Sequence, residues 1–349
     1  MPVYIFESQV QVNYKSRKMI KETKKLIVYS IVSSCLLLNS VTAQSQPNRS
    51  NDASLLNKEI LKIIKKNSLF TDRLDWKSLK VQSDTLTFTD DDLKNEKIIL
   101  DFYINKLRAV GDKHSFFISS YNILKISNVP IAAMPEGEYL GDGIGWIKVP
   151  GLMTFSNNKD IDFANSIRNI IEKIDTQNVI TGWIVDLRHN GGGNMWPMLA
   201  GLNALVEDGI AGYFIQGNKR IPWISKNGKI VGKDQPINTY KIKNYKVKIA
   251  VLIDSQTGSS GEMAAVSLLG LTNVKSFGQT TSGYITANYS YILSSGSQLL
   301  LAKTYVSDRT GKIYKEAIVP DCIVDDLSNT KDDEVVKSAS KWIRESIDF

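Results

Sequence analysis

The chain has 349 residues, a formal net charge of +7, two cysteines and two histidines. This length is sufficient for two or three domains with a sizeable core, and 42% hydrophobic with 23% charged residues excludes a chain that is disordered throughout. So few cysteines and histidines, without zinc-ligand spacing, exclude a disulfide-rich scaffold and do not favour a zinc site. Any imidazole chemistry depends on His114 or His189.

The first 43 residues have the order of a secretory signal peptide. A Lys-Lys pair precedes an apolar run over 26–38, and small residues ending at Ala43 come before a polar stretch. The run is shorter than the roughly 20 apolar residues of a membrane span. We therefore predict a signal peptide over 1–43, with Met19 as an alternative start, and a periplasmic or secreted mature protein.

A lipoprotein signal is the alternative interpretation of this segment. Cys35 follows a sequence that loosely fits a lipidation box, and a lipid there would anchor the protein to a membrane. The three leucines after Cys35 favour simple secretion instead. Removal of the segment would leave Cys322 without an intrachain disulfide partner. The remaining chain has 37 basic and 34 acidic residues, which is too close to neutral for a nucleic-acid partner.

The mature chain divides into a helical part and an α/β part. We predict a linker over 44–54 and a helical N-terminal subdomain over 55–135, because Leu56, Ile60 and Ile64 recur at helical spacing and acidic residues at 90–92 indicate a capped helix start. From 136 to 349 we predict a core domain, with buried strands at 145–149, 183–187 and 249–253 and helices at 161–174 and 195–206. This alternation indicates an α/β fold.

A glycine-rich segment follows the second of these strands. Gly191, Gly192 and Gly193 allow unusual backbone angles and close approach of N–H groups to a ligand, so the loop is suited to an anion or an oxyanion. It lacks the Lys of a P-loop. A simple tight turn is the alternative, but the place after a buried strand is where α/β proteins bind ligands.

Two further segments contain candidate catalytic side chains. Ser259 and Ser260 lie between the third strand and an apolar helix, where a hydroxyl meets the positive end of the helix dipole. Ser259 is also three residues before Glu262, which fits a capping box without any catalytic role. His114, in an Asp-Lys-His-Ser stretch, is either a structural histidine or the base that a serine nucleophile requires.

Four segments stand in the order found in the tail-specific, or C-terminal processing, serine peptidases, and the chain resembles that family over about residues 100–325. The segments are DLRHNGGG (186–193), TGSSGE (257–262), GQTTSG (278–283) and IVPD (318–321). The resemblance implies a crotonase-like (ClpP-like) α/β fold of spiralled ββα units. It implies that Ser259 is the nucleophile, with Ser260 as the alternative, and that the glycine loop and the N–H of Ser260 form the oxyanion hole.

The chain departs from that family in two ways. Tyr284 stands where many members have a catalytic lysine, so the sequence resembles the branch with a Ser–His pair, which includes the tricorn core protease and the nisin-resistance proteins. In that branch the base corresponds to His114 and an orienting acid to Glu316, with His189 as a minor rival base. The roughly 30 residues between His114 and Gly145 are too few for a PDZ module.

The resemblance therefore implies a secreted serine endopeptidase that acts on extracytoplasmic peptides or proteins and needs no metal or organic cofactor. Two alternatives remain: a catalytically silent binding protein of the same fold, holding a peptide or an apolar ligand, and a hydrolase of non-peptide esters. The sequence does not indicate an oligomeric state.

Overall fold

The computed structural model describes residues 49–120, 122–123, 133–153, 157–226, 229–233, 238–326 and 328–345. The predicted signal peptide, the alternative start at Met19 and the lipidation candidate Cys35 lie outside these residues. No helix within them is long and apolar enough to cross a membrane.

Three helices form the N-terminal part of the described chain: α2 (Arg49–Asn67), α3 (Trp76–Asp84) and α4 (Asp92–Ala109), with a 3-10 turn η1 (Thr71–Arg73) after α2. The side chain of Asp91 caps α4 by accepting from the N–H of Lys94 at 3.1 Å, which confirms the capped start. Helix α2 begins at Arg49, so residues 49–54 of the expected linker are helical; Asp52 lies in the first turn, where an acidic side chain stabilises a helix.

The first of two sheets has the strand order β13-β9-β8-β4-β3-β2. Its strands are β2 (Glu136–Tyr139), β3 (Ile144–Lys148), β4 (Gly182–Asp186), β8 (Lys248–Ile253), β9 (Val274–Gly278) and β13 (Cys322–Ile323). All neighbours are parallel except β2 and β3. The three predicted buried strands correspond to β3, β4 and β8 with shifts of no more than one residue, so they are confirmed.

Helices cover both faces of this sheet. They are α6 (Asn157–Gln177), α7 (Met195–Leu202) with its 3-10 extension η2 (Asn203–Leu205), α8 (Ser260–Leu268) and α9 (Glu334–Arg344). Trp183 and Val185 of β4 pack into a cluster with α6, α7 and α8, whereas Ile184 packs with α9. Alternate residues of one strand are thus buried on opposite faces, as in a parallel sheet covered on both sides.

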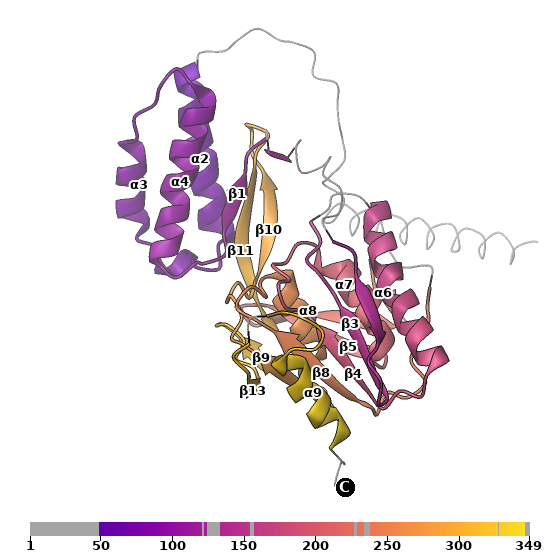
Figure 1. The fold of residues 1–349 in the computed structure, drawn as a ribbon. Helices are drawn as coiled ribbons and strands as arrows, with labels where there is room; N and C mark the ends of the chain where they lie inside the picture. The colour runs from indigo at the N-terminus through magenta and orange to yellow at the C-terminus, as the bar shows by residue number, and fades with distance from the viewer. Residues whose placement is uncertain are drawn as a thin grey trace, which may run out of the picture. The chain divides into compact units, whose positions relative to one another are not determined.

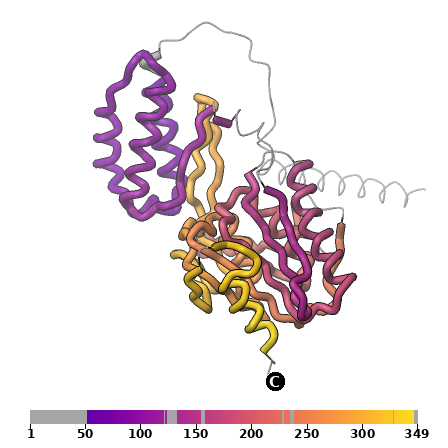
Figure 2. The backbone as a smooth tube through the Cα atoms, in the orientation of Figure 1, coloured from indigo at the N-terminus to yellow at the C-terminus, as the bar shows by residue number. Residues whose placement is uncertain are grey.

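The second sheet is antiparallel and is centred on β11. Its strands are β1 (Phe116–Ile118), β5 (Gly209–Gln216), β6 (Lys219–Lys226), β7 (Lys229–Ile230), β10 (Thr286–Ile292), β11 (Gln298–Ser307) and β12 (Ile313–Tyr314). β11 pairs with β1, β5, β10 and β12. Leu299 and Leu301 of β11 pack with α2 and α4, and Figures 1 and 2 show the β10–β11 hairpin beside these helices. None of the strands of this sheet is among those predicted from the sequence.

The observed fold is therefore a mixed α/β fold with a helical N-terminal part, as expected. The contacts group the chain from Asn48 onward into one unit, and the domain boundary between residues 135 and 136 stays a prediction. The parallel strands β4 and β8 are neighbours, so their carboxyl ends lie at one edge of the sheet. The glycine loop follows β4 and the serine turn follows β8, so this edge brings two candidate segments together.

Candidate active site

Ser259 lies in a strained turn between β8 and α8. Its backbone angles are φ 52° and ψ −118°, a region that side-chain-bearing residues adopt only when surrounding contacts impose it. The contacts here are hydrogen bonds from the Gly258 N–H to Asn190 O at 2.9 Å and from the Gly261 N–H to Gly258 O at 2.9 Å. The turn places a partly exposed hydroxyl at the N-terminus of α8, where the helix dipole favours negative charge.

Ser260 has a different environment from Ser259. Its side chain is buried, and its hydroxyl donates to Gly193 O at 2.5 Å. The hydroxyl of Ser259 donates to no acceptor among the described residues. The two alternative serines therefore differ. Ser260 joins the start of α8 to the glycine loop, whereas Ser259 is presented at the surface of the turn.

Glu262 supports the serine turn from inside the protein. Its fully buried carboxylate accepts from the N–H of Ser259 at 2.9 Å, which is the carboxylate half of the predicted capping box. It also accepts from the hydroxyl of Thr281 at 2.5 Å and from the N–H of Gly283 at 2.9 Å. Burial raises the pKa of Glu262, and these hydrogen bonds oppose that rise. The other half of the capping box is also present, because the Ser259 side chain accepts from the N–H of Glu262. A hydroxyl that accepts a hydrogen bond keeps its own proton to donate, so the capping role does not exclude a catalytic one.

The glycine loop lies directly against the serine turn. Gly192 and Gly193 have φ values of 110° and 113°, which favour glycine. A Cβ on Gly192 would lie 2.8 Å from Ser259 Cβ, and one on Gly193 would lie 2.0 Å from Leu152 O. A side chain at either position would therefore clash. The segment is a tight turn, and it also approaches Ser259 closely.

The backbone N–H groups of this loop are not equivalent. The N–H of Gly191 donates to His189 O at 3.1 Å, and that of Gly192 donates to the side-chain oxygen of Asn190 at 3.0 Å. Among the described residues, no acceptor bonds the N–H groups of Gly193 and Ser260. Of the four predicted oxyanion donors, these two are the ones available to a ligand.

His114 is held rigidly at both its backbone and its ring. Asp112 accepts from the N–H groups of His114 at 3.0 Å and Ser115 at 2.9 Å, so the Asp-x-His-Ser stretch is a side-chain-stabilised turn. The ring atom Nδ1 lies 2.8 Å from the carbonyl oxygen of Thr286. A carbonyl only accepts, so Nδ1 bears the proton and Nε2 keeps its lone pair. Burial lowers the pKa of His114, against the opposing effects of Thr286 and Asp112, which favours a neutral ring at pH 7.

Tyr284 connects His114 to the serine turn. The two rings are stacked, with centroids 5.7 Å apart and planes inclined by 26°. Tyr284 Cδ2 lies 3.3 Å from the position that a Cβ on Gly258 would take. The glycine loop thus contacts Ser259 directly, and His114 is linked to the serine turn through the ring of Tyr284.

Glu316, expected to orient the histidine, is placed elsewhere. Its side chain is 86% exposed and lies 4.0 Å from Lys113 Nζ, while the carbonyl of Thr286 occupies Nδ1 of His114. Sequence reasoning missed Thr286 because a backbone carbonyl leaves no side-chain signal.

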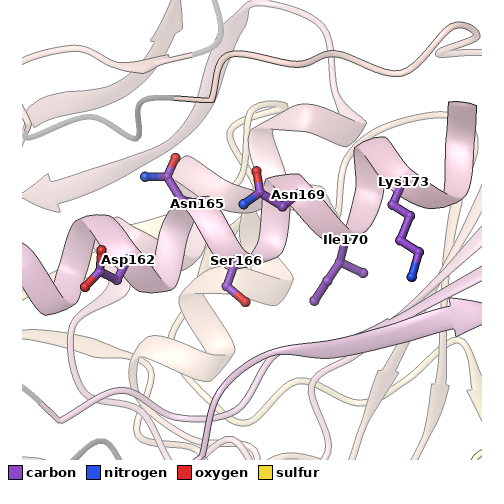
Figure 3. Close-up of a pocket in the computed structure, with 6 residues that line it drawn as sticks. All are labelled: Asp162, Asn165, Ser166, Asn169, Ile170 and Lys173. Carbon is purple, nitrogen blue, oxygen red and sulfur yellow. The ribbon is translucent and has the colours of Figure 1, made fainter.

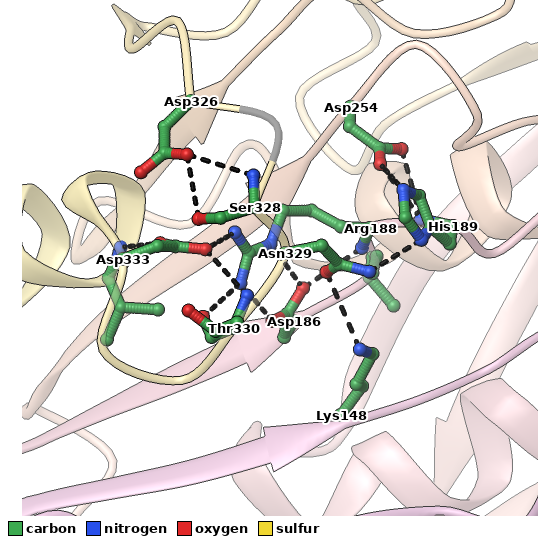
Figure 4. Close-up of polar contacts among 12 residues, drawn as sticks. Lys148, Asp186, Arg188, His189, Asp254, Asp326, Ser328, Asn329, Thr330 and Asp333 are labelled. Atoms are coloured by element: carbon green, nitrogen blue, oxygen red, sulfur yellow. Dashed lines mark hydrogen bonds and ion pairs between the residues drawn. The ribbon is translucent and has the colours of Figure 1, made fainter.

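His189, the minor rival base, has both ring nitrogens engaged (Figure 4). Nε2 lies 3.1 Å from Asp254 Oδ2, and Nδ1 lies 2.5 Å from the side-chain nitrogen of Asn329. Its backbone N–H also donates to Asp254 at 3.0 Å. These contacts give His189 a part in fixing the glycine loop and leave no ring nitrogen available to Ser259.

Arg188 joins the start of the glycine loop to the C-terminal segment (Figure 4). Its buried guanidinium bonds Asp186 Oδ2 at 2.6 Å and Asp333 Oδ2 at 2.5 Å, and it also donates to Thr330 O at 3.2 Å. Asp333 in turn caps α9 by accepting from Val336 N–H at 2.9 Å. The loop that approaches Ser259 is therefore anchored by a buried ionic network.

A separate hollow of about 410 Å³ lies along α6 (Figure 3). Its lining residues all belong to α6, and none takes part in the contacts of Ser259 or His114: Asp162, Asn165, Ser166, Asn169, Ile170 and Lys173. In the described part of the chain, no group of three or more His, Cys, Asp or Glu side chains is arranged to hold a metal ion.

The chain is similar to known proteins in sequence and in fold. A family model described as "Peptidase family S41" matches residues 143–324. The chain is 34% identical over 291 residues to the Nisin-resistance protein of Lactococcus lactis subsp. lactis, covering 82% of this chain and 86% of that protein.

Solved structures share the fold. A lipoprotein from Streptococcus agalactiae superposes with a TM-score of 0.70 at 24% identity, over 89% of this chain and 100% of that one. The photosystem II D1 C-terminal processing protease superposes with a TM-score of 0.55 at 13% identity, over 81% of this chain and 96% of that one.

Proposed function

Because the chain belongs to peptidase family S41, we propose that it is an extracytoplasmic serine-type endopeptidase in which Ser259 is the nucleophile and His114 the general base. The observation that carries this proposal is the strained backbone of Ser259. Such strain persists only where the surrounding structure imposes it, and it occurs preferentially at active sites. The engaged hydroxyl of its neighbour Ser260 supports the same choice.

The proposed mechanism assigns one role to each of these groups. Ser259 Oγ attacks the peptide carbonyl carbon while Nε2 of His114 takes the hydroxyl proton. The N–H groups of Gly193 and Ser260 stabilise the oxyanion. The imidazolium then protonates the leaving amine, the C–N bond breaks, and water hydrolyses the acyl-enzyme by the reverse proton path. Thr286, not Glu316, would hold the ring, so the mechanism uses a dyad with a carbonyl in place of an orienting acid.

Peptide hydrolysis by the wild type and by Ser259→Ala, Ser260→Ala and His114→Ala tests this proposal. We expect the first and third variants to lose activity, whereas Ser260→Ala keeps a nucleophile and loses only its bond to Gly193. Unchanged hydrolysis by Ser259→Ala would contradict the proposal. A wild type that binds peptides without cleaving them would favour the silent binding protein, and cleavage of esters alone would favour the ester hydrolase.

We propose extracytoplasmic peptides as the substrates, with antimicrobial peptides such as nisin as one class to be tested. The similarity to a Nisin-resistance protein supports this choice, as does the predicted signal at 1–43. Mass spectrometry of nisin and of unrelated peptides after incubation with the protein would separate resistance from general processing. Cleavage of the unrelated peptides with nisin left intact would contradict the nisin assignment.

We also propose that the fold is a crotonase-like spiral of ββα units. In this proposal a helical subdomain extends to residue 135 and a core domain begins at residue 136. The succession of β3, α6, β4 and α7 around a parallel sheet supports this assignment.

A further inference from the structure

Three alternate residues of the chain leading into and along β10 contact His114. Tyr284 stacks on its ring, Thr286 O bonds its Nδ1 at 2.8 Å, and the side-chain amide of Asn288 donates to its backbone oxygen at 2.8 Å. The three contacts come from one stretch of five residues, 284–288, which therefore holds both the ring and the backbone of His114.

The position of Tyr284 is fixed from the side of the serine. Glu262 bonds the N–H of Ser259 and also bonds Gly283, the residue immediately before Tyr284, and Thr281, which lies in the same segment. The tyrosine ring lies close against Gly258, the residue before the nucleophile, where an added Cβ would be 3.3 Å from Cδ2. The ring is thus in contact with the base and with the turn of the nucleophile.

We propose that Tyr284 is a positioning residue whose ring forms one wall of the His114 site, and that Glu262 sets this wall at a fixed place relative to Ser259. The inference rests on the proposed function and extends it. The aromatic ring restrains an imidazole that is supplied by a different segment of the chain. The stacked ring also favours the imidazolium formed during acyl transfer, because a cation is attracted to an aromatic face.

The proposed positioning of His114 depends on the aromatic ring of Tyr284 and not on its hydroxyl. No hydrogen bond to the Tyr284 hydroxyl is formed among the described residues, and the side chain is 42% exposed. We therefore expect Tyr284→Phe to stay within about twofold of the wild-type kcat. We expect Tyr284→Ala to lower kcat by about 10- to 100-fold, as misplaced catalytic groups do, with KM changed by less than about twofold.

A second readout is the pH profile of kcat/KM. The groups that face the ring are Asp112 from its own turn, Tyr284 and Thr286 from the β10 side, and the exposed pair of Lys113 and Glu316 nearby. Removal of the tyrosine ring exposes the imidazole to water and also removes the aromatic face that favours the imidazolium, while the other groups stay. Desolvation has the largest effect on the pKa of His114, so the exposure to water outweighs the loss of the aromatic face. We expect the acid limb to shift to higher pH in Tyr284→Ala and to stay in place in Tyr284→Phe.

The experiment measures kcat, KM and the acid limb for wild type, Tyr284→Ala, Tyr284→Phe and the control Tyr289→Ala, which changes a tyrosine on the same strand beneath Lys303. Circular dichroism and thermal melting verify folding. Wild-type-like kcat in folded Tyr284→Ala would overturn the inference, as would a Tyr284→Phe variant as impaired as Tyr284→Ala or an equal loss in Tyr289→Ala. An inactive wild type would instead overturn the proposed function, so the two failures are distinguishable.

Discussion

The contact between Gly192 and the serine turn gives the sharpest quantitative prediction. In Gly192→Ala the new Cβ would meet Ser259 Cβ at 2.8 Å and both Gly258 O and Ser260 N at 3.1 Å. Two of these atoms belong to the backbone of the turn and cannot rotate away, so the loop and the turn must separate. This separation displaces oxyanion donors, and the loss of one such donor costs about 10²–10³ in kcat, or about 2.7–4 kcal/mol.

Backbone strain must be separated from that loss. Gly192 has φ 110°, and Gly141 has φ 91° with no atom within 4 Å of an added Cβ. An alanine at either position is strained by about 1–3 kcal/mol, but only Gly192→Ala disturbs the site. We expect both variants to lose free energy of unfolding, with the larger loss in Gly192→Ala because of the added clash, measured by urea denaturation, and a loss of kcat in Gly192→Ala alone. Wild-type-like kcat in folded Gly192→Ala would refute the placement of the loop against the nucleophile.

Two further predictions concern titration and the buried network. Since burial lowers the pKa of His114, kcat/KM should fall at acid pH with an apparent pKa below about 6.5. Below about pH 6.5 the unfolded chain binds more protons at this group than the folded chain does. The contribution of His114 to the free energy of unfolding is therefore complete above about pH 6.5 and decreases as the pH falls. His114→Gln should remove this pH dependence of the free energy of unfolding, measured in denaturation curves. Asp333→Asn should lower the free energy of unfolding by about 2 kcal/mol, because a hydrogen bond to a charged group is lost while Arg188 keeps Asp186. The exposed neighbour pair of Glu334 with Lys337 provides the control, and a loss in Glu334→Gln equal to that in Asp333→Asn would contradict the role of the buried network.

The parallel core and two parts of the site were predictable because their signals are local. Apolar runs indicated β3, β4 and β8, and the segments that follow β4 and β8 had to meet at one edge of the sheet. The family resemblance is confirmed by the match to residues 143–324 and by the similarity to the Nisin-resistance protein. The roles of Ser259 and His114 in catalysis stay predictions.

The remaining features depend on tertiary contacts that no local pattern encodes. The turn with the positive φ of Ser259 is held by the bond from the Gly258 N–H to Asn190 O, which belongs to the distant glycine-rich segment. The acceptor for Nδ1 of His114 is a backbone carbonyl 172 residues away. The family resemblance implied Glu316 in this role, and a carbonyl acceptor gives no signal in the sequence. The antiparallel sheet was not predictable in the same way, because strands such as β6 and β10 lack the continuous apolar runs of β3, β4 and β8.

The identity of the nucleophile is the central claim, and covalent labelling tests it most directly. The protein is treated with a fluorophosphonate, and the modified residue is located by mass spectrometry of proteolytic fragments in wild type, Ser259→Ala and Ser260→Ala. We predict one adduct on Ser259 in wild type, the same adduct in Ser260→Ala, and none in Ser259→Ala. An adduct on Ser260, or labelling that survives in Ser259→Ala, would contradict the account.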